Sequence, residues 1–151
     1  MKISHRALNK NDIPLLWEMP MREADIAETR AVQGIAPNAA LVNCVKESGN
    51  AIGTFVDGEL ILVHGLGELS RDVGIPWALG TDAIEEHGLY LCKYAKKVVD
   101  RMLLDYPILM NYVDTRNKVH LRWLKWMGFI FPDQYRNFSG TPFALFYKGR
   151  T

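Results

Sequence analysis

The sequence predicts an α/β fold in which a mixed sheet carries helices on both faces. Strand-like and helix-like patterns alternate along the chain, beginning with a strand, several helices and a hairpin. The dipeptide Asp57-Gly58 joins two β-prone runs, which is a strong signal for a two-residue hairpin. A long amphipathic helix then precedes the C-terminal strands. A layered α/β sheet accommodates this order best.

Length and composition predict one globular domain spanning residues 1–151, with 48% hydrophobic and 23% charged residues. The net charge of +1 gives the molecule no overall field that would favour nucleic acid or an anionic membrane. The polar first residues and the lack of an apolar run of about 20 residues predict neither a signal peptide nor a membrane span. Cys44 and Cys92 lack zinc-ligand spacing and are expected to be reduced thiols.

The N-terminal third is expected to hold one strand and three helices. Asp12 is a plausible N-cap, and Pro14 suits the first turn of the helix that follows it. Gly34 is expected to end the second helix in a left-handed conformation. In order, the predicted elements are a strand at residues 3–8 and helices after Asp12, at 22–33 and at 39–46.

The centre of the chain changes to a strand pattern. The hairpin strands are expected at residues 51–56 and 59–66, and a polar loop at 68–74 leads to a strand at 75–79. Asp82 and Glu85 form a capping-box pattern for the longest helix, which is predicted over residues 82–106. The apolar face of this helix would comprise Ile84, Leu91, Ala95, Val98, Met102 and Tyr106.

The C-terminal part is expected to contain three strands and one short helix. After Pro107, a strand at residues 108–113 leads to Asn117, which caps a helix over 118–127 that ends at Gly128. The last two strands are predicted at residues 129–131 and 143–147, separated by a loop at 132–142.

Both the element order and the segment from Asn117 to Phe129 resemble the GNAT superfamily of acyl-CoA-dependent N-acyltransferases. The C-terminal motif of that superfamily has an Asn at a helix start and Gly-Phe eleven and twelve residues later, as Asn117, Gly128 and Phe129 do here. The resemblance implies a GNAT-like, mostly antiparallel mixed sheet.

A closer resemblance is carried by four segments, M-R-E-A-D at Met21, V-D-G-E at Val56, P-W-A-L-G-T-D at Pro76 and N-Y-V-D-T-R-N at Asn111. They are similar to a phage and prophage GNAT-like family that resembles internal virion protein A of short-tailed bacteriophages. The match covers most of the chain. It implies a virion-associated protein, located in the virion or in the host bacterial cytoplasm, whose partners are other virion proteins or a host protein.

The cofactor site of the superfamily depends on a Q/R-x-x-G-x-G/A loop at a helix N-terminus, where backbone N–H groups hold a pyrophosphate. The corresponding segment here, W-A-L-G-T-D-A-I-E-E-H-G, has glycines eight residues apart and no preceding basic residue. The carboxylates of Asp82, Glu85 and Glu86 would repel the anion. The residues that resemble cofactor-binding positions are Leu79, Gly80, Thr81 and Asn117.

The general acid also differs from the superfamily pattern. Many members have a Tyr seven residues after the motif Asn, and Leu124, which cannot donate a proton, stands there. His120 and Tyr112 are candidate substitutes, and His64 is a candidate general base. For His64, a satisfied core or solvent-facing histidine is the alternative interpretation. No spacing among His5, His64, His87 and His120 predicts a metal site.

Two surface features have both a structural and a functional interpretation. Lys118, Arg122 and Lys125 share one side of the short helix, as a solvated basic face or as a docking surface for an acidic partner or nucleic-acid phosphates. The aromatic loop at residues 132–142 is either a protein-contact loop or a well-packed one.

The sequence thus leads to three functional hypotheses. The first is a catalytically degenerate, virion-associated phage or prophage protein that needs no cofactor and acts through protein contacts, alone or as an oligomer. The second is an acetyl-CoA-dependent N-acetyltransferase with an atypical pyrophosphate loop. The third is a small protein that binds a host-defence or phage protein.

Overall fold

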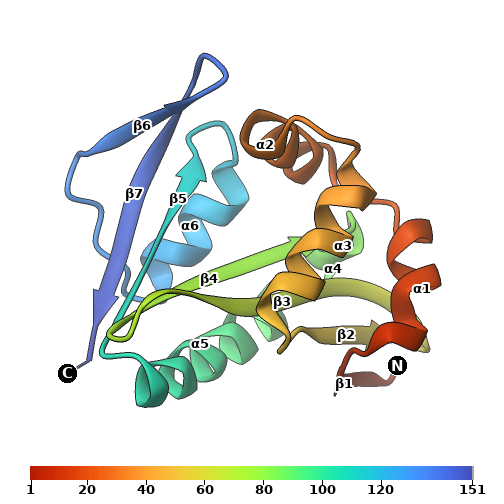
Figure 1. Ribbon diagram of the computed structural model, residues 1–151. Coiled ribbons are helices and arrows are strands. Elements are labelled where there is room, and N and C mark those ends of the chain that lie inside the picture. Colours follow the sequence, from red (N-terminus) through yellow and green to blue (C-terminus); the bar gives the residue numbers. More distant parts are fainter. Residues whose placement is uncertain (151) are drawn as a thin grey trace. The chain divides into compact units, whose positions relative to one another are not determined.

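The computed structural model describes residues 1–150 and has a mixed α/β architecture (Figure 1). Seven strands form one sheet in the order β1-β2-β3-β4-β5-β7-β6, and the β4–β5 pair is parallel while the β1–β2, β2–β3, β5–β7 and β6–β7 pairs are antiparallel. The predicted fold class is confirmed. The elements are β1 (Ile3–Ala7), η1 (Lys10–Asp12), α1 (Ile13–Glu18), α2 (Glu23–Gln33), α3 (Pro37–Ser48), β2 (Ile52–Val56), β3 (Glu59–Ser70), β4 (Val73–Gly80), α4 (Ala83–Glu86), α5 (Gly88–Asp105), β5 (Ile108–Asp114), α6 (Lys118–Trp126), β6 (Tyr135–Phe138) and β7 (Thr141–Gly149).

The chain divides into two compact units. The first comprises Met1–Gly67 and Trp77–Glu86, and the second comprises Glu68–Pro76 and the chain from His87 onwards. Strands β3 and β4 each contribute residues to both units. The single domain expected from chain length stays a prediction.

The first unit buries an apolar core between α1–α3 and one face of its strands. Phe55, Val63 and Leu79 come from three strands, and Leu16 and Leu41 come from α1 and α3. The Asn38 amide donates to the carbonyls of Leu16 (2.8 Å) and Met19 (2.9 Å), which satisfies the end of α1. The predicted hairpin turn is present, because Asp57 (φ 49°) and Gly58 (φ 84°) both have the positive φ that a type I′ turn requires.

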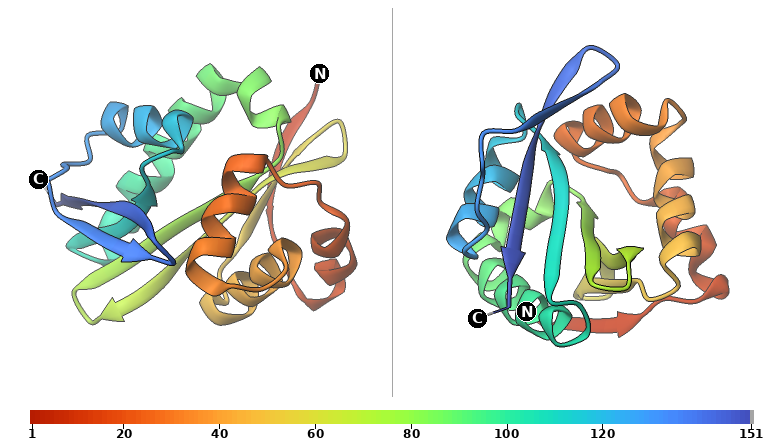
Figure 2. Two further views of the ribbon diagram at one scale, coloured as in Figure 1. Left: turned by 90° about the horizontal axis from the view of Figure 1, so that it is seen from above. Right: turned by 60° about the vertical axis from the view of Figure 1, so that its left-hand side comes forward.

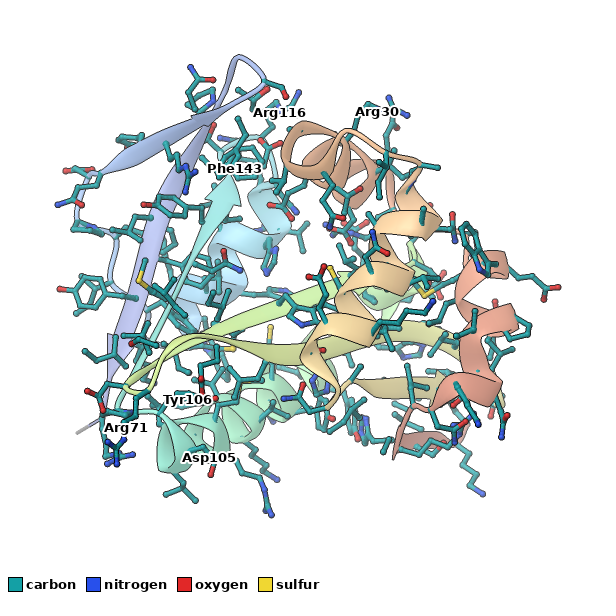
Figure 3. All side chains as sticks on the ribbon, in the orientation of Figure 1. Arg30, Arg71, Asp105, Tyr106, Arg116 and Phe143 are labelled. Atoms are coloured by element: carbon teal, nitrogen blue, oxygen red, sulfur yellow. The ribbon has the colours of Figure 1, made fainter. Side chains whose placement is uncertain are left out.

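The second unit is built on β5, β6 and β7, with α5 and α6. Leu91, Val99 and Leu103 are buried along α5, and Leu124 is buried on α6. Phe129 and Phe146 pack edge to face with ring centroids 5.0 Å apart. Tyr106, labelled in Figure 3, follows the last turn of α5 and donates its hydroxyl to Glu68 at 2.6 Å, which raises the pKa of Tyr106.

The single helix predicted over residues 82–106 is wrong. The structure has a four-residue helix, α4, and then α5, with His87 between them in a non-helical conformation (φ −117°, ψ 25°). The Asp82–Glu85 capping box is also absent, since the Glu85 N–H donates to the backbone carbonyl of Asp82 (3.2 Å) and not to its side chain. The apolar spacing continues across the break, so periodicity alone did not reveal it.

Other boundaries differ from the prediction where hydrogen bonding overrides local composition. The polar loop expected at residues 68–74 is mostly strand, because β3 runs to Ser70 and β4 begins at Val73. The strand expected at residues 129–131 is one isolated bridge, Ile130 to Tyr147. The expected loop at residues 132–142 contains β6, which pairs with β7. A strand pair forms there because β7 offers an edge to pair with, which a local sequence window does not contain.

Asp12 does not cap α1 with its side chain. Its carboxylate accepts from the Asn9 N–H (2.8 Å) and from two nitrogens of Arg6 (2.9 and 3.0 Å). Asn9 instead begins η1 with a capping box. The hydrogen bonds from Arg6 and from the Asn9 backbone lower the pKa of Asp12. Within residues 1–150, no helix has both the length and the apolar character that crossing a membrane requires.

Candidate functional site

Three of the four residues expected to hold a cofactor lie where β4 leads into α4: Leu79 and Gly80 end the strand, and Thr81 begins the short turn after it. The Gly80 N–H donates to the Asp25 carboxylate at 2.9 Å, and the Gly80 carbonyl accepts from the Arg22 N–H at 2.8 Å. The Thr81 N–H donates to the carbonyl of Ile61 at 2.9 Å. The turn is therefore hydrogen-bonded on one side to the start of α2 and on the other to β3.

Three further N–H groups of this segment are also used within the chain. Ala83 donates to the Thr81 hydroxyl, Ile84 to the Thr81 carbonyl and Glu85 to the Asp82 carbonyl, each at 3.2 Å. Helix α4 then ends at Glu86. An anion at this turn would have to displace hydrogen bonds that the chain already makes, and exposed carboxylates of Asp82, Glu85 and Glu86 surround it.

A buried ion pair supports this turn and was missed in the sequence. Arg22 and Asp25 are 4% and 3% exposed, and Arg22 Nη2 lies 3.3 Å from Asp25 Oδ1. The pair brings a basic residue to the turn, although none precedes it in sequence, and Asp25 compensates its charge. The M-R-E-A-D segment contains both residues, so its resemblance to the phage family was the available signal.

Gly80 is a glycine for packing reasons. A Cβ added there would lie 2.9 Å from Ile84 Cγ2 and 3.0 Å from the Ile61 carbonyl oxygen. Backbone atoms cannot move away as a flexible side chain can, so a larger residue would strain the turn. The glycine that resembled a cofactor-loop glycine is thus needed for contact with β3 and α4.

In the second unit, a side chain bridges β4 and β5. The parallel ladder pairs Val73 with Ile108 and Gly74 with Leu109. Two residues further along each strand, the Asn111 amide donates to the Pro76 carbonyl at 2.8 Å, and its Oδ1 accepts from the Tyr112 N–H at 2.7 Å. Pro76 has no N–H. At this position of β4, neither a backbone donor nor an unused carbonyl is therefore available to a ligand.

The motif residues of α6 have structural roles. Asn117 is 2% exposed and its Oδ1 accepts from the His120 N–H at 3.4 Å, so it starts the helix as predicted. Gly128 has φ 93° just after the helix. Leu124, at the position of the expected general acid, is 4% exposed and aliphatic. Helix geometry accounts for Asn117 and Gly128, and packing accounts for Leu124.

The three candidate catalytic residues do not all fall in one unit. His64 belongs to the first unit, and Tyr112 and His120 belong to the second. Tyr112 is half-buried on β5 and packs edge-on against Phe138, with centroids 6.1 Å apart. His120 is half-buried in the first turn of α6. Their catalytic roles, and the cofactor-binding roles above, stay predictions.

His64 is buried on β3, with 6% of its surface exposed. Burial lowers its pKa from 6.5 to about 4, and the nearby charge of His5 adds to this shift. His5 itself lies in hydrogen-bond contact with the Thr54 hydroxyl at 2.8 Å, and burial lowers its pKa too. His64 is therefore neutral in the folded protein near pH 7.

The His64 shift predicts acid sensitivity. Between pH 6.5 and about 4, the unfolded chain binds a proton at His64 that the folded chain excludes, so stability falls as pH falls. We expect His64 to remove about 2–3 kcal/mol of the free energy of unfolding by about pH 4.5. Urea unfolding of the parent and of His64→Gln at neutral pH and at that pH measures this, and the variant should lose less stability. Equal losses would contradict the assignment.

No group of three or more His, Cys, Asp or Glu side chains within residues 1–150 is arranged to hold a metal ion. Cys44 and Cys92 are free thiols, and burial raises the pKa of each.

Comparison with known proteins gives one family model and a set of similar structures. None of the curated proteins compared with the sequence matches it. The family model described as "Bacteriophage T7, probable scaffold protein Gp13" matches residues 79–136, which is fewer than half of the 151 residues.

Three solved structures that are similar over nearly the whole chain are acetyltransferases. A GNAT-family acetyltransferase from Streptococcus pneumoniae aligns with a TM-score of 0.66 and 13% identity, covering 99% of this chain and 100% of its own. The aminoglycoside acetyltransferase AAC(6')-Ib in complex with coenzyme A aligns with a TM-score of 0.68 and 13% identity, covering 99% of this chain and 95% of its own. Spermidine N-acetyltransferase from Vibrio cholerae, in complex with CoA and spermine, aligns with a TM-score of 0.63 and 12% identity, covering 97% of this chain and 95% of its own. The chain therefore has a GNAT-like fold, and over residues 79–136 it is similar to a bacteriophage protein family.

Proposed function

We propose that the chain is a catalytically degenerate GNAT-fold protein of a phage or prophage, associated with the virion and acting through contacts with virion proteins or a host protein. In this proposal it needs no cofactor. The alternative is an acetyl-CoA-dependent N-acetyltransferase that uses the same turn in an atypical way.

The observation that carries the proposal is the hydrogen bond from the Gly80 N–H to the buried Asp25 carboxylate (2.9 Å). An anionic group of the chain itself already accepts from the turn where a pyrophosphate would be held. A bound pyrophosphate would have to displace a carboxylate that is 3% exposed and is paired with Arg22. Leaving a buried charge without its partner typically costs about 3–5 kcal/mol.

Other features support the same conclusion. The Asn111 amide caps the Pro76 carbonyl on β4. Leu124 offers no proton to a leaving thiolate. The similarity of residues 79–136 to a bacteriophage scaffold-protein family supports the phage setting, because it covers this turn together with α5 and α6.

Calorimetric titration with acetyl-CoA tests the proposal. We expect no saturable heat at millimolar ligand, and saturable binding in the micromolar range would overturn it. The variant Asp82→Asn/Glu85→Gln/Glu86→Gln is the informative control, since it removes exposed carboxylates near the turn and leaves the Asp25 hydrogen bond in place. If the hydrogen bonds already made by the N–H groups prevent binding, this variant also shows no saturable heat. If the variant binds acetyl-CoA, repulsion by the exposed carboxylates alone prevents binding by the parent.

The virion assignment has a separate test. Mass spectrometry of purified particles from the phage or prophage that encodes the chain should detect the protein in stoichiometric or near-stoichiometric amounts. Its presence in the lysate and absence from the particles would refute a structural role in the virion.

A further inference from the structure

The near-neutral net charge of the chain conceals a strong charge separation. The first unit carries 6 Lys and Arg against 11 Asp and Glu, a formal charge of −5, and the second carries 12 against 6, a formal charge of +6. The absence of a whole-molecule field therefore does not extend to the second unit. A local potential of this size attracts anionic partners.

Much of the positive charge of the second unit lies on its two helices. Seven exposed cations define what we call the α5–α6 basic face: Lys93, Lys96, Lys97, Arg101, Lys118, Arg122 and Lys125. Asp100 is the one carboxylate between Lys93 and Arg101, and α6 contains none. None of the seven forms an ion pair with another side chain of the described residues, 1–150. Their charge is not neutralised within the protein.

The helices α5 and α6 lie next to each other (Figure 2). Lys96 Nζ of α5 lies 5.4 Å from the centre of the Trp126 ring of α6, and a Cβ added at Gly88 would lie 3.9 Å from the Trp123 ring. Lys93, Lys97 and Arg101 follow one another at four-residue intervals, which places successive charges about 6 Å apart along α5.

An aromatic ring lies within this charged surface. Trp126, the last residue of α6, is 51% exposed, and its ring contacts Lys96 of α5. An exposed indole among cations has a face on which a nucleobase can stack, and stacking tolerates any base. A surface that recognised only isolated carboxylates would use the cations and would gain little from the ring.

We infer that the α5–α6 basic face binds single-stranded nucleic acid, with the cations contacting phosphates and Trp126 stacking on a base. A row of uncompensated charges matches a polyanion whose charges repeat regularly, and the ring favours unpaired bases over a duplex. This binding is independent of the proposed function, because none of its residues contributes to the β4–α4 turn.

Fluorescence anisotropy with a labelled oligothymidylate of about 20 nucleotides tests the inference. We expect binding at low salt that weakens steeply between about 50 and 200 mM salt. The variant Lys96→Gln/Arg122→Gln/Lys125→Gln should lower affinity at least tenfold and reduce the slope of log K against log salt by about 2, since each lost contact removes about 0.7. The matched control Lys2→Gln/Lys10→Gln/Lys46→Gln neutralises three exposed cations of the first unit and should leave binding unchanged.

The role of the ring is tested separately with Trp126→Leu, which should weaken binding by about 5- to 100-fold, and with Trp126→Phe, which should restore much of it. Circular dichroism and unfolding midpoints identify any variant that is misfolded. Lys97→Gln alone replaces the triple basic-face variant if that variant is misfolded, and Trp126→Phe remains the test of the ring if Trp126→Leu is. No binding by the parent at low salt, unchanged binding by the basic-face variant, or a duplex bound as tightly as the single strand would each overturn the inference. Equal binding of a poly-glutamate peptide would also overturn it, by identifying the surface as one for acidic proteins.

Discussion

Replacement of Asp25 by alanine is expected to lower the free energy of unfolding by about 3–5 kcal/mol. The substitution removes a buried carboxylate that pairs with Arg22 at 3.3 Å and accepts from the Gly80 N–H at 2.9 Å. A guanidinium only 4% exposed then loses the countercharge that compensates its burial. Chemical denaturation of the parent and variant at neutral pH measures the effect.

The control for Asp25→Ala is Arg30→Ala on the same helix. Arg30 is exposed near the end of α2 (Figure 3), and its loss should change stability by about 0.5 kcal/mol or less. Arg22→Met/Asp25→Leu, which removes both charges, should be less damaging than Asp25→Ala alone. If Asp25→Ala were as mild as Arg30→Ala, the buried pair would not stabilise the turn, and the structural basis of the proposed function would fail.

Replacement of Phe143 by alanine should destabilise the second unit by about 3–5 kcal/mol. Phe143 lies on β7 (Figure 3), is 1% exposed, and contacts the Phe138 ring edge-on with centroids 4.8 Å apart. It pairs with Asp114 of β5 and with Arg136 of β6, so the ring lies on the middle strand of the β5-β7-β6 segment, near its end. The cavity left by the ring adds to the lost burial of apolar surface.

Guanidinium unfolding monitored by circular dichroism measures the Phe143 effect. Phe143→Leu keeps much of the volume and should show a clearly smaller loss, whereas Tyr135→Ala, at a position 60% exposed on neighbouring β6, should be nearly neutral. A loss below about 1 kcal/mol for Phe143→Ala would mean that the site collapses around the cavity or that the ring is not buried as described.

Turn and capping residues correctly predicted the elements that they begin or end. The Asp57-Gly58 hairpin, the left-handed Gly34 after α2 and the Asn117-to-Gly128 helix were all correct, because each depends on a few consecutive residues with restricted φ. The break at His87 was missed for the opposite reason. The apolar spacing continues from Ile84 to Leu91, so the pattern is the same for one helix or two.

The position of the candidate site was visible in the sequence, but its hydrogen-bond partners were not. Leu79 and Gly80 end β4, Thr81 begins the turn after it, and the carboxylates near this turn were identified in the sequence. The group that accepts from the Gly80 N–H is Asp25, 55 residues away in sequence. Asn111, whose amide reaches the Pro76 carbonyl, is likewise 35 residues from its acceptor. No local pattern specifies such pairings.

The charge of the chain gives a similar contrast. The basic face of α6 was visible in sequence as Lys118, Arg122 and Lys125, yet a net charge of +1 argued against an anionic partner. These cations and those of α5 belong to the second unit, whose formal charge is +6, whereas the first unit has a formal charge of −5. The sequence left an acidic partner and nucleic-acid phosphates as alternatives for the α6 cations, and the contact between Lys96 and Trp126 adds the cations of α5 and an exposed ring to the same surface.

The sequence by itself determined the α/β fold class, most of the elements and the helix that Asn117 begins, because periodicity, turn residues and caps act over a few neighbouring positions. The GNAT-like form of the fold was implied by the family resemblance. The tertiary structure alone decided how the β4–α4 turn is used. The N–H of Gly80 is satisfied by a carboxylate from α2, and a buried donor can choose among all acceptors that folding brings within about 3 Å. That choice depends on packing across the whole unit.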